Sequence, residues 1–411
     1  MNRRSFLRLA APAALAGVPG CDFSVREGLF NACRAALPPL LQSHPLVNDA
    51  WNGIDPTRVV DFHCHLFGNG DSGEGVWVNP STAGVIAPAQ WMQRMFYLNA
   101  GCVHDHPGRV DASVVDRLRN QAQALPQGVR LLLLAFDWAR DERGMPQKDR
   151  STFYVGDEYA ARIASSYPRS FEWAASIHPY DPSALDRLDR AIAARARAVK
   201  WLPTAQNIDP ASKRCVAFYR RLAALGVPLI THGGEERAVT AHDASFGNPL
   251  KLRVALDEGV RVIVAHCASL GVAHDTDRGG VATSAFALFA RLMDEARYAG
   301  RLFGDLSAVT FGNRSDDVLA TLLVRSDWHG RLINGSDYPL PGVLPLVALD
   351  RFVARGMLAA DAVPVLREIR DHHAILFDFV LKRALRAPHR TPAQRLPATV
   401  FETRRHLAGS G

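Results

Sequence analysis

The chain has 411 residues, of which 48% are hydrophobic and 22% are charged, and its formal net charge is +7. This composition is ordinary for a globular protein and supplies enough apolar material for a core. The arginines are scattered rather than clustered, so the charge does not indicate a nucleic-acid partner. No apolar run approaches the roughly 18 residues that a membrane-spanning helix requires.

Residues 1–21 are typical of an export signal and are left out of the fold prediction. The run Arg3-Arg4-Ser5-Phe6-Leu7-Arg8 resembles the twin-arginine motif R-R-x-F-L-K, which directs folded proteins to the periplasm. Two processing sites compete. Ala14-Leu15-Ala16 fits a small-x-small cleavage pattern, whereas Val18-Pro19-Gly20-Cys21 resembles a lipobox with an atypical proline. We therefore predict a periplasmic protein, either released or attached to the membrane through a lipid on Cys21.

The rest of the chain alternates short apolar runs with helical patterns, as in strand–helix–strand units of a parallel sheet. Residues 22–57 are predicted to be an N-terminal extension and residues 58–386 the main domain. Eight runs are almost continuously apolar, as expected for strands covered on both faces. They are residues 58–63, 130–136, 172–177, 198–202, 228–231, 261–265, 302–305 and 332–334. Eight such units predict an α/β fold, a (β/α)8 TIM barrel.

Three segments lie outside this regular pattern. A long insertion, residues 67–128, follows the first strand and begins with several glycines, whose spacing favours a mobile loop over a phosphate site. Residues 387–411, rich in arginine and proline, are predicted to be a C-terminal tail on the surface or disordered. The six cysteines are widely spaced, and a Cys33–Cys102 disulfide is compatible with the periplasm without being favoured by the sequence.

Histidines and an aspartate occur at corresponding strand ends. The first strand ends at His63-Cys64-His65, and alternation along a strand directs both histidines to the same side. Alone, this pair favours a structural role over metal binding. The fifth, sixth and eighth strands, however, end at His232, His266 and Asp337. Because the carboxyl ends of barrel strands form the active-site mouth, these four coincidences predict a metal site.

The ligand pattern resembles the amidohydrolase superfamily. The segments VVDFHCHL, VPLITHGGE, VRVIVAHCA, LFGDLSA and INGSDYP are similar to the branch containing metal-dependent hydrolases and enzymes of the aminocarboxymuconate-semialdehyde decarboxylase type. The similarity covers about residues 58–380. One departure is His373-Ala374, where the branch usually has an asparagine-alanine pair; this difference affects packing more than chemistry.

The resemblance implies a role for each residue of the pattern. His63, His65 and His232 would bind a divalent metal ion, with Asp337 as a further ligand or as the carboxylate that accepts a proton from water. His266 would be a general acid/base or a ligand of a second ion. Such an ion lowers the pKa of its water from about 15.7 towards 7 and polarises the bond under attack. Zinc is the ion we expect, although a His/Asp set also accepts manganese, iron or cobalt.

The number of metal ions depends on Lys200, at the end of the fourth strand. Two-metal members of the superfamily carry a carboxylated lysine there that bridges the ions, but lysine also occurs in one-metal members. We favour one ion and keep two as the alternative. Weaker candidates for substrate contact or for orienting a ligand are His178, Asp137 and Asp305, which end the third, second and seventh strands.

Three functions are compatible with this pattern. The first is a hydrolase in which activated water attacks an ester, lactone, amide or related bond of a small molecule. The second is non-oxidative decarboxylation of a small carboxylic acid at the same metal site. The third is a non-catalytic binding lipoprotein, which would be expected to lack ligands. No ligand of the pattern is missing, which argues against the third function. We favour the hydrolase because the pattern leaves a carboxylate and a histidine for proton transfer. Such barrels often form homodimers.

Overall fold

The computed structural model of the chain describes residues 25–82, 87–103, 107–390, 392 and 394–409. The export signal predicted at residues 1–21, with the lipid attachment site at Cys21, therefore lies outside the described residues. Within the described part of the chain, no helix is both long enough and apolar enough to cross a membrane.

Eight parallel strands of the described residues form the central barrel. They are β1 Val60–His65, β3 Arg130–Leu134, β5 Phe171–Ala174, β6 Val199–Trp201, β7 Leu229–His232, β8 Val262–Ala265, β11 Leu302–Asp305 and β12 Leu332–Ile333. One sheet has the order β1-β3-β5 and the other the order β6-β7-β8-β11-β12. Parallel bridges join Ala175 to Val199 and Cys64 to Tyr338, and so connect the two sheets at both edges. The chain therefore has the TIM-barrel fold predicted from the sequence, and the strand bounds differ from those predicted by three residues or fewer.

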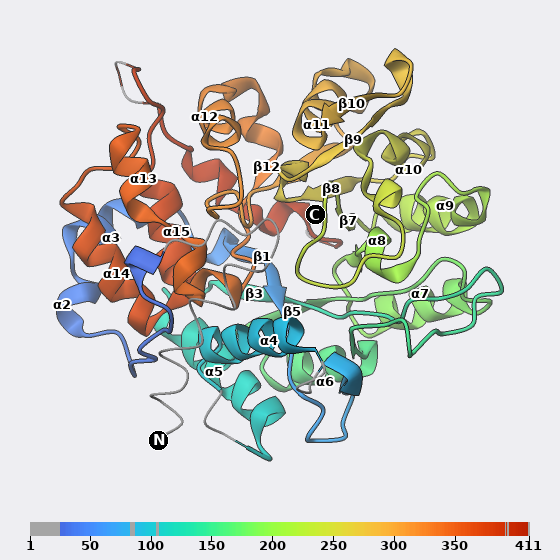
Figure 1. Cartoon of the computed structure of the whole chain (residues 1–411), viewed down its shortest axis with the longest axis horizontal. Helices are drawn as coiled ribbons and strands as arrows, with labels where there is room; N and C mark the ends of the chain where they lie inside the picture. Colours follow the sequence, from blue (N-terminus) through green and yellow to red (C-terminus); the bar gives the residue numbers. More distant parts are fainter. Residues whose placement is uncertain (1–24, 83–86, 104–106, 391, 393, 410–411) are drawn as a thin grey trace.

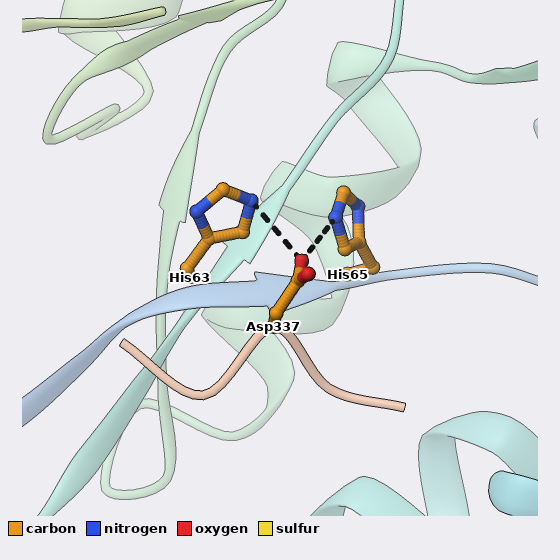
Figure 2. A group of neighbouring side chains, drawn as sticks. All are labelled: His63, His65 and Asp337. Atoms are coloured by element: carbon orange, nitrogen blue, oxygen red, sulfur yellow. Dashed lines mark hydrogen bonds and ion pairs between the residues drawn. The ribbon is translucent and has the colours of Figure 1, made fainter. Parts of the chain in front are cut away.

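The barrel interior is filled by side chains of alternate strand residues. This inner cluster consists of Val60, Phe62, Leu132, Leu134, Ala174, Ala198, Ile230, Ile263, Ile333 and Leu407. A register shift between Asp61 and Cys64 places one extra residue of β1 opposite β3. Such a bulge re-aims the side chains that follow it. Phe62 lies in the inner cluster with Val60, whereas Cys64 packs in the outer core, and His63 and His65 both point towards Asp337 (Figure 2).

Helices surround the strands on the outside of the barrel (Figure 1). Their apolar faces pack on the sheet to form the large outer core, which includes Leu118, Leu188, Leu222, Leu288 and Leu322. The covering helices are α5 Val110–Ala124, α6 Asp157–Ser166, α7 Ala184–Ala193, α9 Val216–Leu225, α10 Arg253–Asp257, α11 Ala285–Asp294, α12 Asp316–Val324, α14 Ala362–His372 and α15 Ala374–Ala384. The other elements are α2 Pro39–Gln42, α3 Pro45–Trp51, α4 Pro88–Ala100, α8 Pro203–Gln206, α13 Leu349–Ala354, and the antiparallel pairs β2 Val76–Val78 with β4 Phe153–Val155 and β9 Val272–Asp275 with β10 Val281–Ser284.

The N-terminal extension packs against the barrel. Trp51 at the end of α3 stacks on Phe379 of α15, with 4.1 Å between ring centroids. The buried carboxylate of Glu27 accepts hydrogen bonds from Arg367 and Arg370, each at 2.8 Å. A disulfide between Cys33 and Cys102 ties the extension to the insertion after β1. The pairing that the sequence left open is thus present.

The glycine-rich start of the insertion is folded around a carboxylate, in place of the mobile loop that we predicted. Buried Asp111 accepts hydrogen bonds from the backbone N–H groups of Asn69, Gly70 and Ser72, at 2.8–3.1 Å, and from the Ser72 hydroxyl at 2.7 Å. A Cβ at Gly68 would lie 2.1 Å from the Asp111 carboxylate, so glycine is needed there. The segment therefore supports the beginning of α5.

The C-terminal segment closes the end of the barrel at which the strands begin, opposite the mouth. The prediction of a surface or disordered tail was wrong. Val400, Phe401 and Leu407 are almost completely buried, and Leu407 belongs to the inner cluster. The hydroxyl of Thr403 accepts a hydrogen bond from the Val60 N–H at 2.9 Å and donates one to the Val60 carbonyl. The physical reason is that an open barrel end exposes apolar side chains, which this segment covers.

Candidate active site

His63 and His65 extend from β1 towards Asp337, which follows β12 (Figure 2). His65 Nε2 lies 3.1 Å from Asp337 Oδ1, and His63 Nε2 lies 3.5 Å from the same oxygen. The potential ligand atoms of these three residues all lie within 4.8 Å of one another, as a metal site requires. His63 and Asp337 are buried, whereas the His65 side chain is 28% exposed. The cluster is therefore open to the mouth on the side of His65.

The backbone holds Asp337 against β1. Its N–H donates to the His63 carbonyl at 2.8 Å, and its φ of 65° lies in the left-handed region. Asp61 links the two segments by accepting hydrogen bonds from the N–H groups of Ser336 at 2.7 Å and His63 at 3.2 Å. Burial alone would raise the pKa of Asp337, but the neighbouring histidines hold it well below its ordinary value. Asp337 is thus an ionised carboxylate in a buried site.

Asp305 at the end of β11 orients His63, as expected for one of the weaker sequence candidates. Its Oδ2 lies 2.5 Å from His63 Nδ1, and its carboxylate also accepts hydrogen bonds from the Ser307 N–H and hydroxyl, each at 2.7 Å. Burial opposes ionisation, but these bonds and the nearby histidines lower the pKa of Asp305 to about 2. With its Nδ1 proton held by Asp305, His63 presents an unprotonated Nε2 to the cluster.

Lys200 on β6 contacts this same nitrogen, with its Nζ 3.1 Å from His63 Nε2. Burial lowers the pKa of Lys200 to about 8, against the opposing effect of three carboxylates, Asp305, Asp337 and Glu236. The lysine predicted to decide between one ion and two therefore lies within the cluster itself.

His266 lies beside His63 and His232, with ring centroids 5.0 and 5.2 Å away. Its Nδ1 lies 3.0 Å from the Ser307 carbonyl, which leaves Nε2 for proton transfer or for a ligand. Burial lowers the pKa of His266 to about 3, so the ring is neutral. This position is compatible with both roles that the resemblance implies.

His232 at the end of β7 belongs to neither group of closely spaced ligand atoms in the described residues, which are His63/His65/Asp337 and His63/His266/Asp305. Its Nε2 lies 3.2 Å from Glu236 Oε2, and its Nδ1 is buried without a hydrogen-bond partner. Sequence reasoning missed Glu236. The signal that could have found it is a second acidic residue, directly after Glu235, one tight turn beyond a predicted ligand.

Arg314, in the loop between β11 and α12, was also missed. Its Nε and Nη1 are buried and have no hydrogen-bond partner. Burial lowers the pKa of Arg314 to about 10, although the charges of Asp337 and Glu236 oppose the shift. Free donors on a buried guanidinium cost free energy unless a ligand supplies acceptors. In the sequence, this arginine is indistinguishable from the many on the surface.

His178 and Asp137 form part of a different polar network. The N–H of His178 donates to Asp137, and its Nε2 donates to the Gln206 carbonyl at 2.8 Å. Asp137 is also paired with Arg187 at 2.8 Å. Among the described residues, no hydrogen bond or ion pair joins His178 or Asp137 to the His63 cluster. Their contacts are those of buried polar groups that fix the loops after β3 and β5.

The donor set fits a divalent metal ion. Burial keeps His63, His232 and His266 neutral by lowering each pKa, and metal binding requires unprotonated imidazoles. Asp337 supplies a negative charge, and the Nδ1 of His232 is a buried nitrogen without a hydrogen-bond partner. A TIM barrel with histidines and carboxylates at the carboxyl ends of its strands defines a class of metal-dependent enzymes.

Comparison with known proteins identifies the family. A family model described as Amidohydrolase matches residues 60–348, and the chain therefore belongs to the amidohydrolase family, whose members are metal-dependent. No curated protein matches the chain significantly.

The solved structures that this chain is similar to share little of its sequence, and three of them are described below. An uncharacterized TIM-barrel protein from Bordetella bronchiseptica is 15% identical, with a TM-score of 0.45 over 75% of this chain and 94% of that chain. A putative 2-pyrone-4,6-dicarboxylic acid hydrolase from Pseudomonas putida is 15% identical, with a TM-score of 0.43 over 78% and 97%. A 2,6-dihydroxybenzoate decarboxylase from Rhizobium is 12% identical, with a TM-score of 0.42 over 78% and 97%.

Proposed function

We propose that the protein is a metal-dependent hydrolase that cleaves an ester, lactone, amide or related bond of a small molecule. The observation that carries this proposal is the convergence of His63, His65 and ionised Asp337 at one point of the barrel mouth. These residues and His232 would hold one divalent ion, for which zinc is our first choice. Bound there, the ion would lower the pKa of water and polarise the bond under attack.

The protein's own groups would move the proton. Asp337 is ionised and within reach of both β1 histidines, so its carboxylate is the base that accepts the proton of the attacking water. His266 is neutral and its Nδ1 proton is held by the Ser307 carbonyl, so its Nε2 carries a lone pair that would accept the proton released from water and pass it to the leaving group. Buried Lys200 and Arg314 add positive charge to the mouth, which favours an anionic substrate.

Arg314 also favours a second candidate, non-oxidative decarboxylation of a small carboxylic acid. The unpartnered Nε and Nη1 donors of Arg314 suit the acceptor oxygens of a carboxylate. Retaining the carboxylate as a recognition group and releasing it as carbon dioxide are both compatible with that contact. The two reactions therefore differ in product and not in the residue that holds the acid.

The first test is metal content per chain, measured by plasma mass spectrometry on the wild type and on the double variant His63→Ala/His65→Ala. We expect about one equivalent, lost in the variant. Two equivalents would instead support a bridging role for Lys200. No bound metal in protein produced with ample zinc and manganese would overturn the proposal.

The second test separates the reactions. The metal-loaded enzyme is assayed with 4-nitrophenyl acetate and dihydrocoumarin for hydrolysis, and with 2-pyrone-4,6-dicarboxylate and 2,6-dihydroxybenzoate for both products. Hydrolysis incorporates ¹⁸O from labelled water, whereas decarboxylation releases carbon dioxide. We expect Asp337→Ala to abolish turnover with the fold intact, and full activity in that variant would contradict the assignment. Release of carbon dioxide without ¹⁸O incorporation would select the decarboxylase.

We also propose that the protein acts in the periplasm. The Cys33–Cys102 disulfide supports this location, because such bonds persist in oxidising compartments. Replacing Arg3 and Arg4 by lysine is expected to strand the protein in the cytoplasm, and normal export would point to a different signal. Labelling with palmitate, beside a Cys21→Ser control, distinguishes a lipoprotein from a released enzyme.

A further inference from the structure

We infer that Glu236 is a positioning residue that fixes the proton of His232 on Nε2, so that His232 presents Nδ1 to a bound metal ion. This inference rests on the proposed function for the presence of the ion. The contact between the two side chains, however, can be tested without it.

The first step is the close approach of the two side chains. His232 ends β7, and the chain then turns back through Gly233 and Gly234. Gly234 has a φ of 83°, and a Cβ there would lie 2.4 Å from the Leu270 carbonyl, so this turn requires glycine. The turn brings Glu236 Oε2 to 3.2 Å from His232 Nε2, with the side chains only 7% and 5% exposed. The contact is therefore shielded from water.

The second step is that Glu236 is held in place independently of His232. Its Oε1 accepts hydrogen bonds from the backbone N–H groups of Ala238 at 2.5 Å and Val239 at 3.3 Å. These bonds orient the carboxylate so that Oε2 faces the imidazole. A fixed carboxylate oxygen favours the ring tautomer whose N–H points towards it, and the proton of His232 is therefore expected on Nε2.

The third step concerns the other nitrogen of the ring. With the proton on Nε2, Nδ1 carries the lone pair, and this atom is buried without a hydrogen-bond partner. A buried polar atom in that state costs free energy. A divalent ion at the mouth would provide the missing partner. The opposite tautomer is disfavoured because its Nδ1 proton would be buried without an acceptor and its Nε2 lone pair would face a carboxylate.

The same arrangement occurs at His63 with the nitrogens exchanged. Asp305 holds the Nδ1 proton of His63, so Nε2 carries the lone pair and faces Lys200 and Asp337. In both cases a buried carboxylate contacts one nitrogen of a mouth histidine and leaves the other for a ligand, as is usual for metal-binding histidines. Glu235, the preceding residue, differs: it is 41% exposed and paired with Arg237. It therefore offers a matched control.

The test uses full-length protein freed of metal by chelation and then titrated with Zn²⁺ in competition with a chromophoric chelator. Glu236→Met removes the acceptor, and we expect it to weaken zinc binding 10–100-fold. Glu236→Gln keeps a neutral acceptor and should lose less. Glu235→Gln should remain within about twofold of the wild type. Thermal unfolding of the metal-free variants shows whether each one folds.

A second measurement reads the proton directly. Nitrogen NMR of histidine-labelled, metal-free protein, with His232 assigned through a His232→Gln variant, should show the proton on Nε2 in the wild type. In Glu236→Met this preference should be lost, which a purely structural role of Glu236 would not predict. A proton on Nδ1 in the wild type, or unchanged zinc affinity in Glu236→Met, would overturn the inference. If the wild type binds no metal, the proposed function fails while the NMR result still decides the inference.

Discussion

Removal of one hydroxyl group, that of Thr403, tests whether the C-terminal segment anchors the strand that carries His63 and His65. Thr403 contacts both the N–H and the carbonyl of Val60, the first residue of β1, and both residues are buried. Replacing Thr403 by valine keeps the shape of the side chain and removes the hydroxyl. The substitution adds apolar surface, so an argument from burial alone predicts unchanged or higher stability.

The hydrogen bonds predict the opposite. Loss of the hydroxyl leaves the Val60 N–H buried without an acceptor, which costs about 1–3 kcal/mol. The Val60 carbonyl loses one partner as well, and it can accept elsewhere because it has two lone pairs. We therefore expect Thr403→Val to lower the free energy of unfolding by about 1–3 kcal/mol, with metal content per folded chain unchanged, because Val60 begins the strand whose other end carries His65.

Urea denaturation followed by circular dichroism measures this difference. Thr399→Val is the control, because Thr399 lies on the same segment and is exposed, and its stability should remain within about 0.5 kcal/mol of the wild type. A Thr403→Val protein as stable as the wild type would refute the reasoning. Equal losses in both variants would attribute the effect to valine rather than to the hydroxyl.

Three further predictions follow from buried contacts elsewhere in the chain. Asp305→Asn should weaken zinc binding 10–100-fold in chelator competition, because the carboxylate that orients His63 is lost; unchanged affinity would argue against that role. Replacing both Cys33 and Cys102 by serine should lower the free energy of unfolding by about 4 kcal/mol in urea, since the bond closes a loop with a sequence separation of 69, and reduction of the wild type should reproduce the loss. For Glu27, burial raises the pKa, but hydrogen bonds and charges from two arginines outweigh it and hold the pKa below 4.5. Its ionised form therefore stabilises the protein above about pH 4.5, and the advantage over Glu27→Gln, measured by thermal unfolding, should shrink as the pH falls through the folded pKa.

The barrel could be predicted because its strands are marked by composition alone. Runs such as residues 130–136 are apolar on both faces, a pattern that few other structures produce. The ends of the runs are less well marked. Ile177 is as buried as a strand residue, but it follows the last ladder pair of its strand. Whether such a residue pairs depends on the neighbouring strand, which the local sequence does not reveal.

The C-terminal segment shows why composition failed elsewhere. Its prolines and arginines are typical of a surface tail, yet Phe401 and Leu407 are buried in the core. The arginines remain compatible with this burial because they lie at the rim, where Arg404 donates to the Thr57 carbonyl and to Glu172. A segment that fills the open end of a barrel can be recognised only once the barrel exists.

The candidate site likewise contains residues that the sequence predicts and residues that it does not. His63, His65, His266 and Asp337 could be predicted because each one lies near or just beyond the carboxyl end of a strand, and a barrel brings these ends together. Glu236 and Arg314 lie on loops, whose paths depend on tight turns and on packing between distant segments. Sequence reasoning thus finds the candidate ligands that strands position, and it misses the side chains that loops place beside those ligands.

Backbone strain at the barrel mouth coincides with these strand ends. After β8, His266, Cys267 and Ala268 have φ values of 56°, 51° and 50°, and Asp337 has 65°. Each left-handed non-glycine residue costs roughly 1–2 kcal/mol, so packing around the turn must offset it. Cys267 contributes, since its buried thiol donates to the Asp305 carbonyl at 3.3 Å. The strained turn places His266 Nδ1 on the Ser307 carbonyl, and the same loop supplies the Ser307 groups bound to Asp305. Packing therefore maintains backbone strain where β8, β11 and β12 end. Such strain is expected at a site that depends on precise side-chain placement. It supports a catalytic rather than a purely structural role for His266 and Asp337.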